Sequence, residues 1–246
     1  MSHTDGPKHK NDIYGDDLKA EGDGTPAIPA ATVVLLKDDP DPRVLMLHKT
    51  SKIAFGGMWV FPGGRIDAGD GADDEPMEAR ARRAAAREAE EECGLRVDAA
   101  GMAWFSHWTP PALGNRRFAT WFFAAGAPAG EVCVDQGEIT ESRWITPTDA
   151  LSRHAEGEIE LVPPTYVTLH YLSHYTSVDA AMAALDRQTP RYYETRIAQS
   201  GDDLVAMWTG DAGYESGDPG LPGPRHRLQM GSEGFRFDDS GLASER

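Results

Sequence analysis

The sequence predicts an α/β fold in which a mixed β-sheet packs against helices. Apolar runs at residues 28–36 and 44–48 flank KDDPDPR, a turn rich in Asp and Pro, and this order is typical of a β-hairpin. A long run of Ala, Glu and Arg at residues 77–93 has the composition of a helix. Further extended segments are expected at residues 96–100, 103–108 and 118–125. A hairpin, a long helix and further strands together indicate a mixed α/β sandwich.

The long helix has a start signal and a stop signal. Pro76 suits the first helical position, where its missing N–H would have no partner. Gly94 suits the position just past the end, because glycine adopts the left-handed conformation at little cost. Near that end, Glu88, Glu91 and Glu92 are spaced i, i+3 and i+4, so their side chains share one face of the helix.

This acidic face calls for a positive partner. The three carboxylates repel one another, and the partly negative C-terminal end of the helix adds to the repulsion. Clustered oxygen ligands suit Mg²⁺ or Mn²⁺, which complete their coordination with water and substrate phosphate. Arg87 lies one turn before Glu91 and is predicted to hold that carboxylate in position. The alternative is a solvated acidic helix face, which an isolated Glu-rich helix would favour.

The helix and its surroundings resemble the signature of the Nudix hydrolase family, G-x5-E-x7-R-E-U-x-E-E-x-G-U, in which U is an apolar residue. REAEEECGL, at residues 87–95, matches the second half, with Ala89 at the first apolar position. Gly64 and Asp70 resemble the first half, with aspartate replacing glutamate. Sixteen residues, instead of seven, separate Asp70 from Arg87. We expect the nine extra residues to lie in the loop before the helix, because surface loops tolerate insertions.

The resemblance implies the Nudix α/β/α sandwich and a metal-dependent hydrolase. The substrate class it implies is a small molecule, a nucleoside diphosphate linked to a second moiety X, whose diphosphate is hydrolysed. It further implies that Mg²⁺ or Mn²⁺ is bound by Glu88, Glu91 and Glu92, with the backbone carbonyl of Gly63 or Gly64 beside them. Arg87 would orient the carboxylates. Glu91, or a glutamate of the strand near residue 138, would take the proton from the attacking water.

Two further segments contribute candidate residues. GEITESRWI, at residues 137–145, favours a strand, and Glu138 is the preferred additional catalytic glutamate. Glu141 is the second choice, since the sequence does not decide which side chain faces inward. Arg116 and Arg117 precede an aromatic strand, and at least one is expected to bind the substrate diphosphate through its fork of N–H donors. Two surface arginines are the alternative.

The identity of X depends on weaker matches. WTPP at residues 108–111 and RRF at 116–118 resemble the branch of the family that contains peroxisomal coenzyme A diphosphatases and their bacterial relatives. This resemblance favours coenzyme A or acyl-coenzyme A. Residues 54–62 depart from the further motif of that branch, so ADP-ribose, dinucleotides and nucleotide sugars stay open.

The composition restricts partners and compartment. A formal net charge of −16 argues against nucleic acid or an anionic membrane surface as the main partner. The same charge makes a bound cation necessary if the substrate is a phosphate compound. Cys93 and Cys133 are too few for a disulfide framework, and no apolar run suggests a membrane span or a signal core. We expect a soluble, cytoplasmic protein.

Three parts are predicted along the chain. Residues 1–27 are polar and lack periodicity, so we expect a flexible N-terminal tail. Residues 28–187 are predicted to form the Nudix domain. Residues 188–246 contain strand-like runs and a Gly/Pro-rich stretch, and they are predicted to form a β-rich extension. This extension would either cover the cleft or build a homodimer interface.

Other classes of function fit the sequence less well than hydrolysis does. A Nudix-fold module that binds or senses a nucleotide without cleaving it usually lacks a metal carboxylate, whereas all three glutamates are present here. A structural or interaction protein would carry the same carboxylates as solvated charge and would not bind Mg²⁺ tightly. An isomerase relative acting on prenyl diphosphates would need a cysteine in the cleft, and neither cysteine is obviously placed there. Hydrolysis is therefore the prediction.

Overall fold

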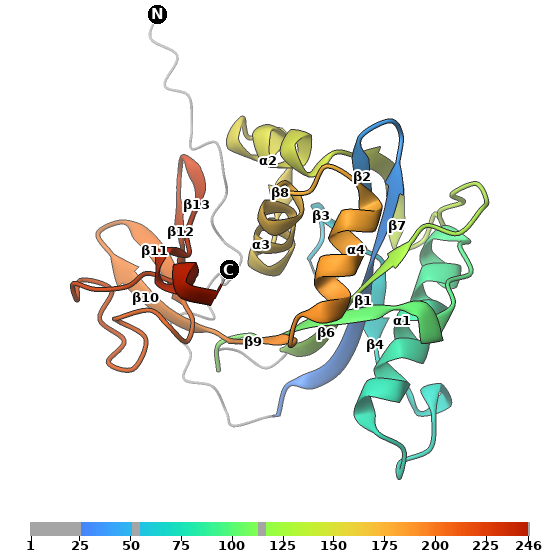
Figure 1. Cartoon of the computed structure of the whole chain (residues 1–246), viewed down its shortest axis with the longest axis horizontal. Helices are drawn as coiled ribbons and strands as arrows, with labels where there is room; N and C mark the ends of the chain where they lie inside the picture. The colour runs from blue at the N-terminus through green and yellow to red at the C-terminus, as the bar shows by residue number, and fades with distance from the viewer. Residues whose placement is uncertain (1–25, 51–54, 113–116, 246) are drawn as a thin grey trace, which may run out of the picture.

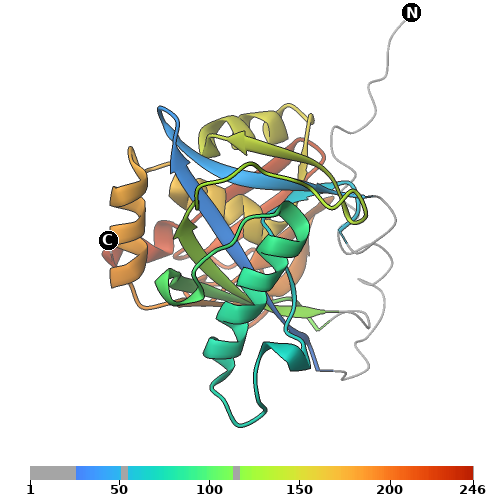
Figure 2. The same ribbon diagram turned by 90° about the vertical axis from the view of Figure 1, so that its right-hand side faces the viewer.

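A mixed β-sheet forms the centre of the protein in this computed structural model, which describes residues 26–50, 55–112 and 117–245. One helix lies on one face of the sheet, and three helices lie on the side of the other face (Figures 1 and 2). The single helix is α1 (Met77–Cys93), and the other three are α2 (Pro147–Ala155), α3 (Pro163–Leu172) and α4 (Val178–Arg187). The predicted α/β class is confirmed.

The central sheet has nine strands among the described residues, in the order β8-β3-β2-β1-β6-β5-β9, with β4 also paired to β1 and β7 to β2. The strands are β1 (Ile28–Asp38), β2 (Pro42–Lys49), β3 (Met58–Val60), β4 (Gly63–Arg65), β5 (Ala103–Thr109), β6 (Phe118–Gly126), β7 (Ile139–Ile145), β8 (Glu160–Leu161) and β9 (Arg191–Glu194). β1 and β2 form the predicted antiparallel hairpin, whereas β1 and β6 run parallel. The sheet is therefore mixed.

Strand β1 is the centre of this sheet because both of its faces are buried. Residues 30–36 are all buried, which explains why this strand is a continuous apolar run rather than an alternating one. Ala31, Val33 and Leu35 belong to the core beneath α1, and Val34 and Leu36 belong to the core on the opposite face. Successive side chains point to opposite faces, so one strand joins the two cores.

Helix α1 ends where the sequence predicts. Gly94 has a left-handed φ of 72°, and its N–H caps the helix by donating to the carbonyls of Ala89 and Glu90. The start differs from the expectation for the insertion. The sixteen residues between Asp70 and Arg87 divide between a loop at residues 71–76 and the first turns of the helix. Alanines in those turns are buried against the sheet, and this packing extends the helix instead of the loop.

The expected extended segment at residues 96–100 is not a strand. A short 3-10 turn, Ala99–Gly101, forms there, and the Asp98 side chain starts it by accepting a hydrogen bond from the Ala100 N–H. Aspartate competes for nearby backbone donors in this way and favours turns over strands. The other two expected segments form β5 and β6.

The C-terminal residues form a second, antiparallel sheet. Its order is β10-β11-β12-β13, from Arg196–Ser200, Asp203–Met207, Arg227–Gly231 and Gly234–Asp238. β9, just before it, runs parallel to β5 in the central sheet. Trp108 of β5 stacks on Tyr193 of β9 at 3.7 Å between ring centroids, and Trp208 meets Trp108 edge-on at 5.4 Å. The predicted β-rich extension is therefore present and shares an aromatic core with the rest of the protein.

The boundaries predicted between the three parts of the chain, at residues 27 and 187, remain predictions. Across the ranges that the structure describes, no helix has both the length and the apolar composition needed to cross a membrane.

Candidate active site

A cavity of about 810 Å³ brings together most of the predicted site residues. It lies where α1, β4, the beginning of β6 and the beginning of α3 meet. Its charged lining comprises Lys49, Arg65, Asp67, Arg87, Glu88, Glu91, Glu92, Arg117, Asp135 and Glu138. Its apolar lining includes Phe55, Trp108, Pro110, Pro111, Phe118, Phe122, Val162, Pro163 and Pro164. The cavity thus offers a charged surface and an apolar surface to one ligand.

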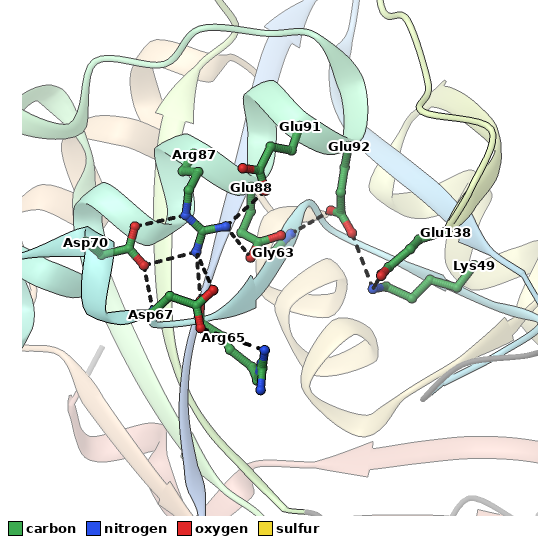
Figure 3. Close-up of polar contacts among 10 residues, drawn as sticks. All are labelled: Lys49, Gly63, Arg65, Asp67, Asp70, Arg87, Glu88, Glu91, Glu92 and Glu138. Atoms are coloured by element: carbon green, nitrogen blue, oxygen red, sulfur yellow. Dashed lines mark hydrogen bonds and ion pairs between the residues drawn. The ribbon is translucent and has the colours of Figure 1, made fainter.

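Arg87 is the centre of the polar network in this cavity (Figure 3). Its Nε lies 2.9 Å from Asp70 Oδ1 and its Nη2 lies 3.0 Å from Asp70 Oδ2, a two-pronged ion pair. Its Nη1 lies 2.8 Å from Glu88 Oε1 and 3.0 Å from Glu91 Oε2. One guanidinium therefore orients two of the three predicted metal carboxylates, as the sequence predicted for Glu91.

Asp70 holds the Arg87 guanidinium in position. The aspartate is only 4% exposed, and the backbone N–H of Asp67 donates to its Oδ2 at 2.7 Å. Burial by itself raises the pKa of Asp70, but the hydrogen bonds from Arg87 and Asp67 outweigh it, so the pKa lies below its usual value. Asp70 is therefore ionised at neutral pH. It pairs with Arg87 even though the long interval between them departs from the family spacing.

The two glycines of β4 leave room for the carboxylates. A Cβ on Gly64 would overlap the carboxylate of Glu88, coming within 2.7 Å of its Oε2 and nearer still to its other atoms. A Cβ on Gly63 would lie 2.5 Å from the Ala31 carbonyl oxygen. Glycine is thus required at both positions because of close approach rather than backbone conformation. The N–H of Gly63 also donates to Glu92 Oε2 at 2.9 Å.

Glu92 is the most deeply buried carboxylate of the three. It is 5% exposed, and burial raises its pKa to about 7 although Lys49 and the Gly63 N–H oppose the shift. Lys49 Nζ lies 3.3 Å from Glu92 Oε1 and 3.7 Å from Glu138 Oε2, so this ammonium group bridges both carboxylates. Burial likewise raises the pKa of Glu88, against the influence of Arg87.

Lys49 is a site residue that the sequence did not indicate. It ends β2, and only the pairing of β2 with β7, which sets Lys49 opposite Ile139, brings it beside Glu138. Its spacing from the glutamates along the chain is too long to carry a local signal. Asp135 was also missed. It accepts backbone N–H groups of Glu138 and Ile139 at 3.0 and 2.9 Å and thereby fixes the turn that presents Glu138.

The structure separates the two candidate glutamates of the β7 region. Glu138 lines the cavity and faces Lys49. Glu141 is absent from the cavity lining and pairs with Arg143 at 2.7 Å on the exposed side. The preference for Glu138 therefore agrees with its position, while its catalytic role stays a prediction.

Of the two candidate substrate-binding arginines, the structure describes one. Arg116 lies outside the described residues. Arg117 lines the cavity, and its Nη1 donates to the Pro110 carbonyl at 3.5 Å, a long hydrogen bond. Its role in binding a phosphate stays a prediction.

The donor chemistry of the cavity fits a divalent cation. Carboxylates of Glu88, Glu91, Glu92 and Glu138 all line it, and the buried Glu92 Oε1 has the Lys49 ammonium, 3.3 Å away, as its charged partner. In the described part of the chain, however, no three acidic, His or Cys groups converge closely enough to hold a metal ion as they stand. Arg87 and Lys49 hold the carboxylates in their present directions. Glu91 and Glu138 are the exposed members of the set, with 59% and 61% of their side chains accessible.

The model of the NUDIX domain family matches residues 27–164, more than half of the chain. The chain is 30% identical over 144 residues to acyl-coenzyme A diphosphatase NUDT19 of Xenopus laevis, an alignment that covers 52% of this chain and 36% of that protein. The chain thus matches only about a third of the length of this curated relative.

The structure is similar to a NUDIX hydrolase from Alicyclobacillus acidocaldarius. The TM-score is 0.59 at 23% sequence identity, over 68% of this chain and 100% of that chain. A likeness at this identity shows the fold. The predicted sandwich with its mixed sheet is thereby confirmed.

Proposed function

Because this chain belongs to the Nudix hydrolase family, we propose that it is a metal-dependent hydrolase of a nucleoside diphosphate linked to a second moiety, X. Water would attack phosphorus, the diphosphate bond would break, and two phosphomonoester products would leave. The observation that carries this proposal is the Arg87 network, which holds Glu88 and Glu91 at a cavity large enough for a nucleotide derivative. Such an array suits phosphoryl transfer, in which positioning and charge neutralisation provide most of the catalysis.

Residues of the chain divide the work as follows. Glu88, Glu91 and Glu92 would hold Mg²⁺ or Mn²⁺, with a backbone carbonyl of Gly63 or Gly64 beside them. The ion would polarise the phosphoryl oxygens and lower the pKa of a bound water. Arg87 holds Glu88 and Glu91 in position, while the Gly63 N–H and Lys49 favour the ionised form of Glu92.

Proton transfer and substrate binding fall to groups at the rim. Glu91 or Glu138 would accept the proton of the attacking water, since both are exposed to the cavity. Arg117, or Arg116 in the segment outside the described residues, would bind the phosphate that does not react.

Coenzyme A or acyl-coenzyme A is the first candidate for the whole substrate. The relative from Xenopus laevis is named an acyl-coenzyme A diphosphatase, and the sequence matches to that branch supply the same suggestion. The apolar lining around Trp108 and the prolines at 110–111 and 163–164 suits the long, weakly polar arm of such a molecule. A cytoplasmic location and a homodimer stay predictions.

The decisive experiment is a product-resolved hydrolysis screen with Mg²⁺ and with Mn²⁺. The panel contains coenzyme A, acetyl-coenzyme A, NADH, ADP-ribose, a diadenosine polyphosphate and a nucleoside triphosphate. We expect one compound to be cleaved only with metal, and Glu91→Gln to abolish the cleavage. Glu90→Gln is the matched control, because Glu90 is the neighbouring exposed residue, pairs with Arg96 and does not line the cavity.

The alternative is a nucleotide-binding or regulatory module of the same fold. It predicts that a panel compound raises the melting temperature while no compound is turned over. That outcome would replace the hydrolase proposal.

A further inference from the structure

Phe55 occupies an unusual position at the cavity. Its side chain is 44% exposed, although it is a large apolar residue, and its backbone φ is 60°. A positive φ is uncommon for residues other than glycine, and bulky side chains rarely adopt it. Two glycines that would tolerate this conformation follow directly, at residues 56 and 57. The chain thus places an aromatic residue where packing does not demand one and where the backbone resists it.

Hydrogen bonds hold this conformation in place. The N–H of Met58 donates to the Phe55 carbonyl at 3.1 Å and closes a tight turn. The N–H of Gly57 donates to the carbonyl of Lys49 at 2.9 Å and ties the turn to the end of β2. Backbone strain maintained by its surroundings is typical of ligand-binding positions.

The ring of Phe55 packs beside a second ring of the cavity lining. Its centroid lies 6.3 Å from that of Phe118, the first residue of β6, with 53° between the ring planes. A planar group stacked between two rings needs roughly 7 Å from ring to ring, because atoms in contact lie about 3.5 Å apart. The present separation is close to that value, so a flat ligand would enter when the tilted rings turn parallel and move slightly apart.

The pair lies at a suitable distance from the carboxylates. Strand β1 pairs with β4 through Ala31 opposite Gly64, and with β6 through Ile28 opposite Phe118. Glu88 lies directly over Gly64, which is offset from Phe118 by about 10 Å along the strands and by about 10 Å across them, because β4 and β6 flank β1 on opposite sides. Both Glu88 and Phe118 line the same cavity, so an elongated nucleotide derivative can reach from one to the other.

We infer that Phe55 and Phe118 hold the nucleobase of the substrate between their rings and select for compounds that carry one. This inference rests on the proposed function of the same cavity. Stacking on two facing rings suits a flat π-system, which every nucleobase has, more than it suits a flexible arm. The second moiety of the substrate would then lie along Trp108 and the prolines of the lining.

The test measures binding by calorimetry in the presence of Ca²⁺, with ADP and inorganic pyrophosphate as probes. Wild type should bind ADP at least about tenfold more tightly than pyrophosphate, the size expected for base stacking. Phe55→Ala and Phe118→Leu should remove that preference and leave the affinity for pyrophosphate unchanged. Phe55→Tyr should retain it. Tyr192→Ala, which removes an exposed aromatic residue outside this cavity, should bind both probes as wild type does.

A second measurement separates ligand binding from a structural role. Phe55→Gly relieves the positive φ, so its melting temperature should equal or exceed that of wild type while its affinity for ADP falls. A lower melting temperature accompanied by weaker pyrophosphate binding would make Phe55 a structural residue and overturn the inference.

Two other outcomes would also overturn it. One is equal binding of ADP by wild type and Phe55→Ala. The other is weaker binding of coenzyme A by Phe55→Ala with ADP binding unchanged, which would assign the rings to the second moiety. Because these are binding measurements, a failure of hydrolysis in the substrate screen would leave their interpretation intact.

Discussion

Two buried Asp–Arg pairs in the described part of the chain have the same geometry but lie in different surroundings. Asp70 with Arg87 and Asp211 with Arg227 are both two-pronged, and both aspartates are nearly inaccessible to solvent. In both, hydrogen bonds from arginine and backbone outweigh burial and hold the pKa of the aspartate below its usual value. The pairs differ in where the remaining N–H groups of the arginine point.

Arg227 directs its remaining N–H donor at a backbone carbonyl. Its Nη1 donates to the Pro219 carbonyl at 2.7 Å, and the N–H groups of Gly213 and His226 complete the shell of Asp211. These additional partners are all backbone groups, and the pair links the Gly/Pro-rich segment to β12. Arg87 instead directs its remaining donors partly at carboxylates that line a cavity. The comparison teaches that the same ion pair holds a loop when the other donors of its arginine contact the backbone, and positions cavity-lining carboxylates when those donors contact side chains.

The largest effect is expected from breaking the Asp211–Arg227 pair. Arg227→Met leaves Asp211 buried without its counter-charge, which costs about 3–5 kcal/mol of unfolding free energy. Urea unfolding measures this loss. At temperatures where the variant is folded, its kcat should equal that of wild type, because the pair lies away from the cavity lining. A large loss of kcat with unchanged stability would show that the two pairs are not distinct in role.

The next effect concerns the Asp70–Arg87 pair at the cavity. Arg87→Lys keeps the charge but loses the fork that contacts Asp70, Glu88 and Glu91 together, so we expect kcat to fall about 10- to 100-fold. Steady-state kinetics on the substrate found in the screen provides the measurement. Arg96→Lys is the control, because Arg96 pairs with Glu90 just beyond α1 and lies outside the cavity lining. Equal activity in Arg87→Lys and wild type would rule out the positioning role.

The third effect is a dependence of protein stability on pH that arises from Glu92 in the candidate site. The folded pKa of Glu92, about 7, exceeds its usual value of 4.5, so between these values the folded protein binds more protons than the unfolded chain. Stability of the metal-free protein should therefore decrease as pH rises from 4.5 to 7, by about 3 kcal/mol. Glu92→Gln should show a smaller decrease in urea unfolding, the remainder coming from Glu88, whose pKa burial also raises. A parallel pH profile for the two proteins would contradict the assignment.

The smallest effect tests the fit between β4 and α1. Gly64→Ala places a methyl group against the Glu88 carboxylate and should displace it, with a roughly tenfold loss of metal affinity. Gly69→Ala, whose added Cβ would meet nothing within 4 Å, should bind metal as wild type does. Calorimetric titration with Mn²⁺ compares the two variants. Indistinguishable affinities would mean that Glu88 does not depend on this close approach.

Much of the fold and part of the site could be predicted because the signals are local. The spacing of Glu88, Glu91 and Glu92 places them on one helix face whatever the rest of the chain does, and Gly94 ends that helix through its own φ. The β1–β2 hairpin depends on a short turn between two apolar runs. These features involve neighbours in the chain, so composition and periodicity reveal them.

What the tertiary structure alone decided involves contacts between distant segments. Three features depend on strand register and on loops that meet at one cavity: the bridge from Lys49 to Glu92 and Glu138, the position of Glu138 rather than Glu141 in the cavity lining, and the Phe55–Phe118 pair. A shift of one residue in register would send each side chain to the opposite face. The sequence by itself thus determined the helix that carries the carboxylates, whereas packing of the whole chain determined which other groups they meet.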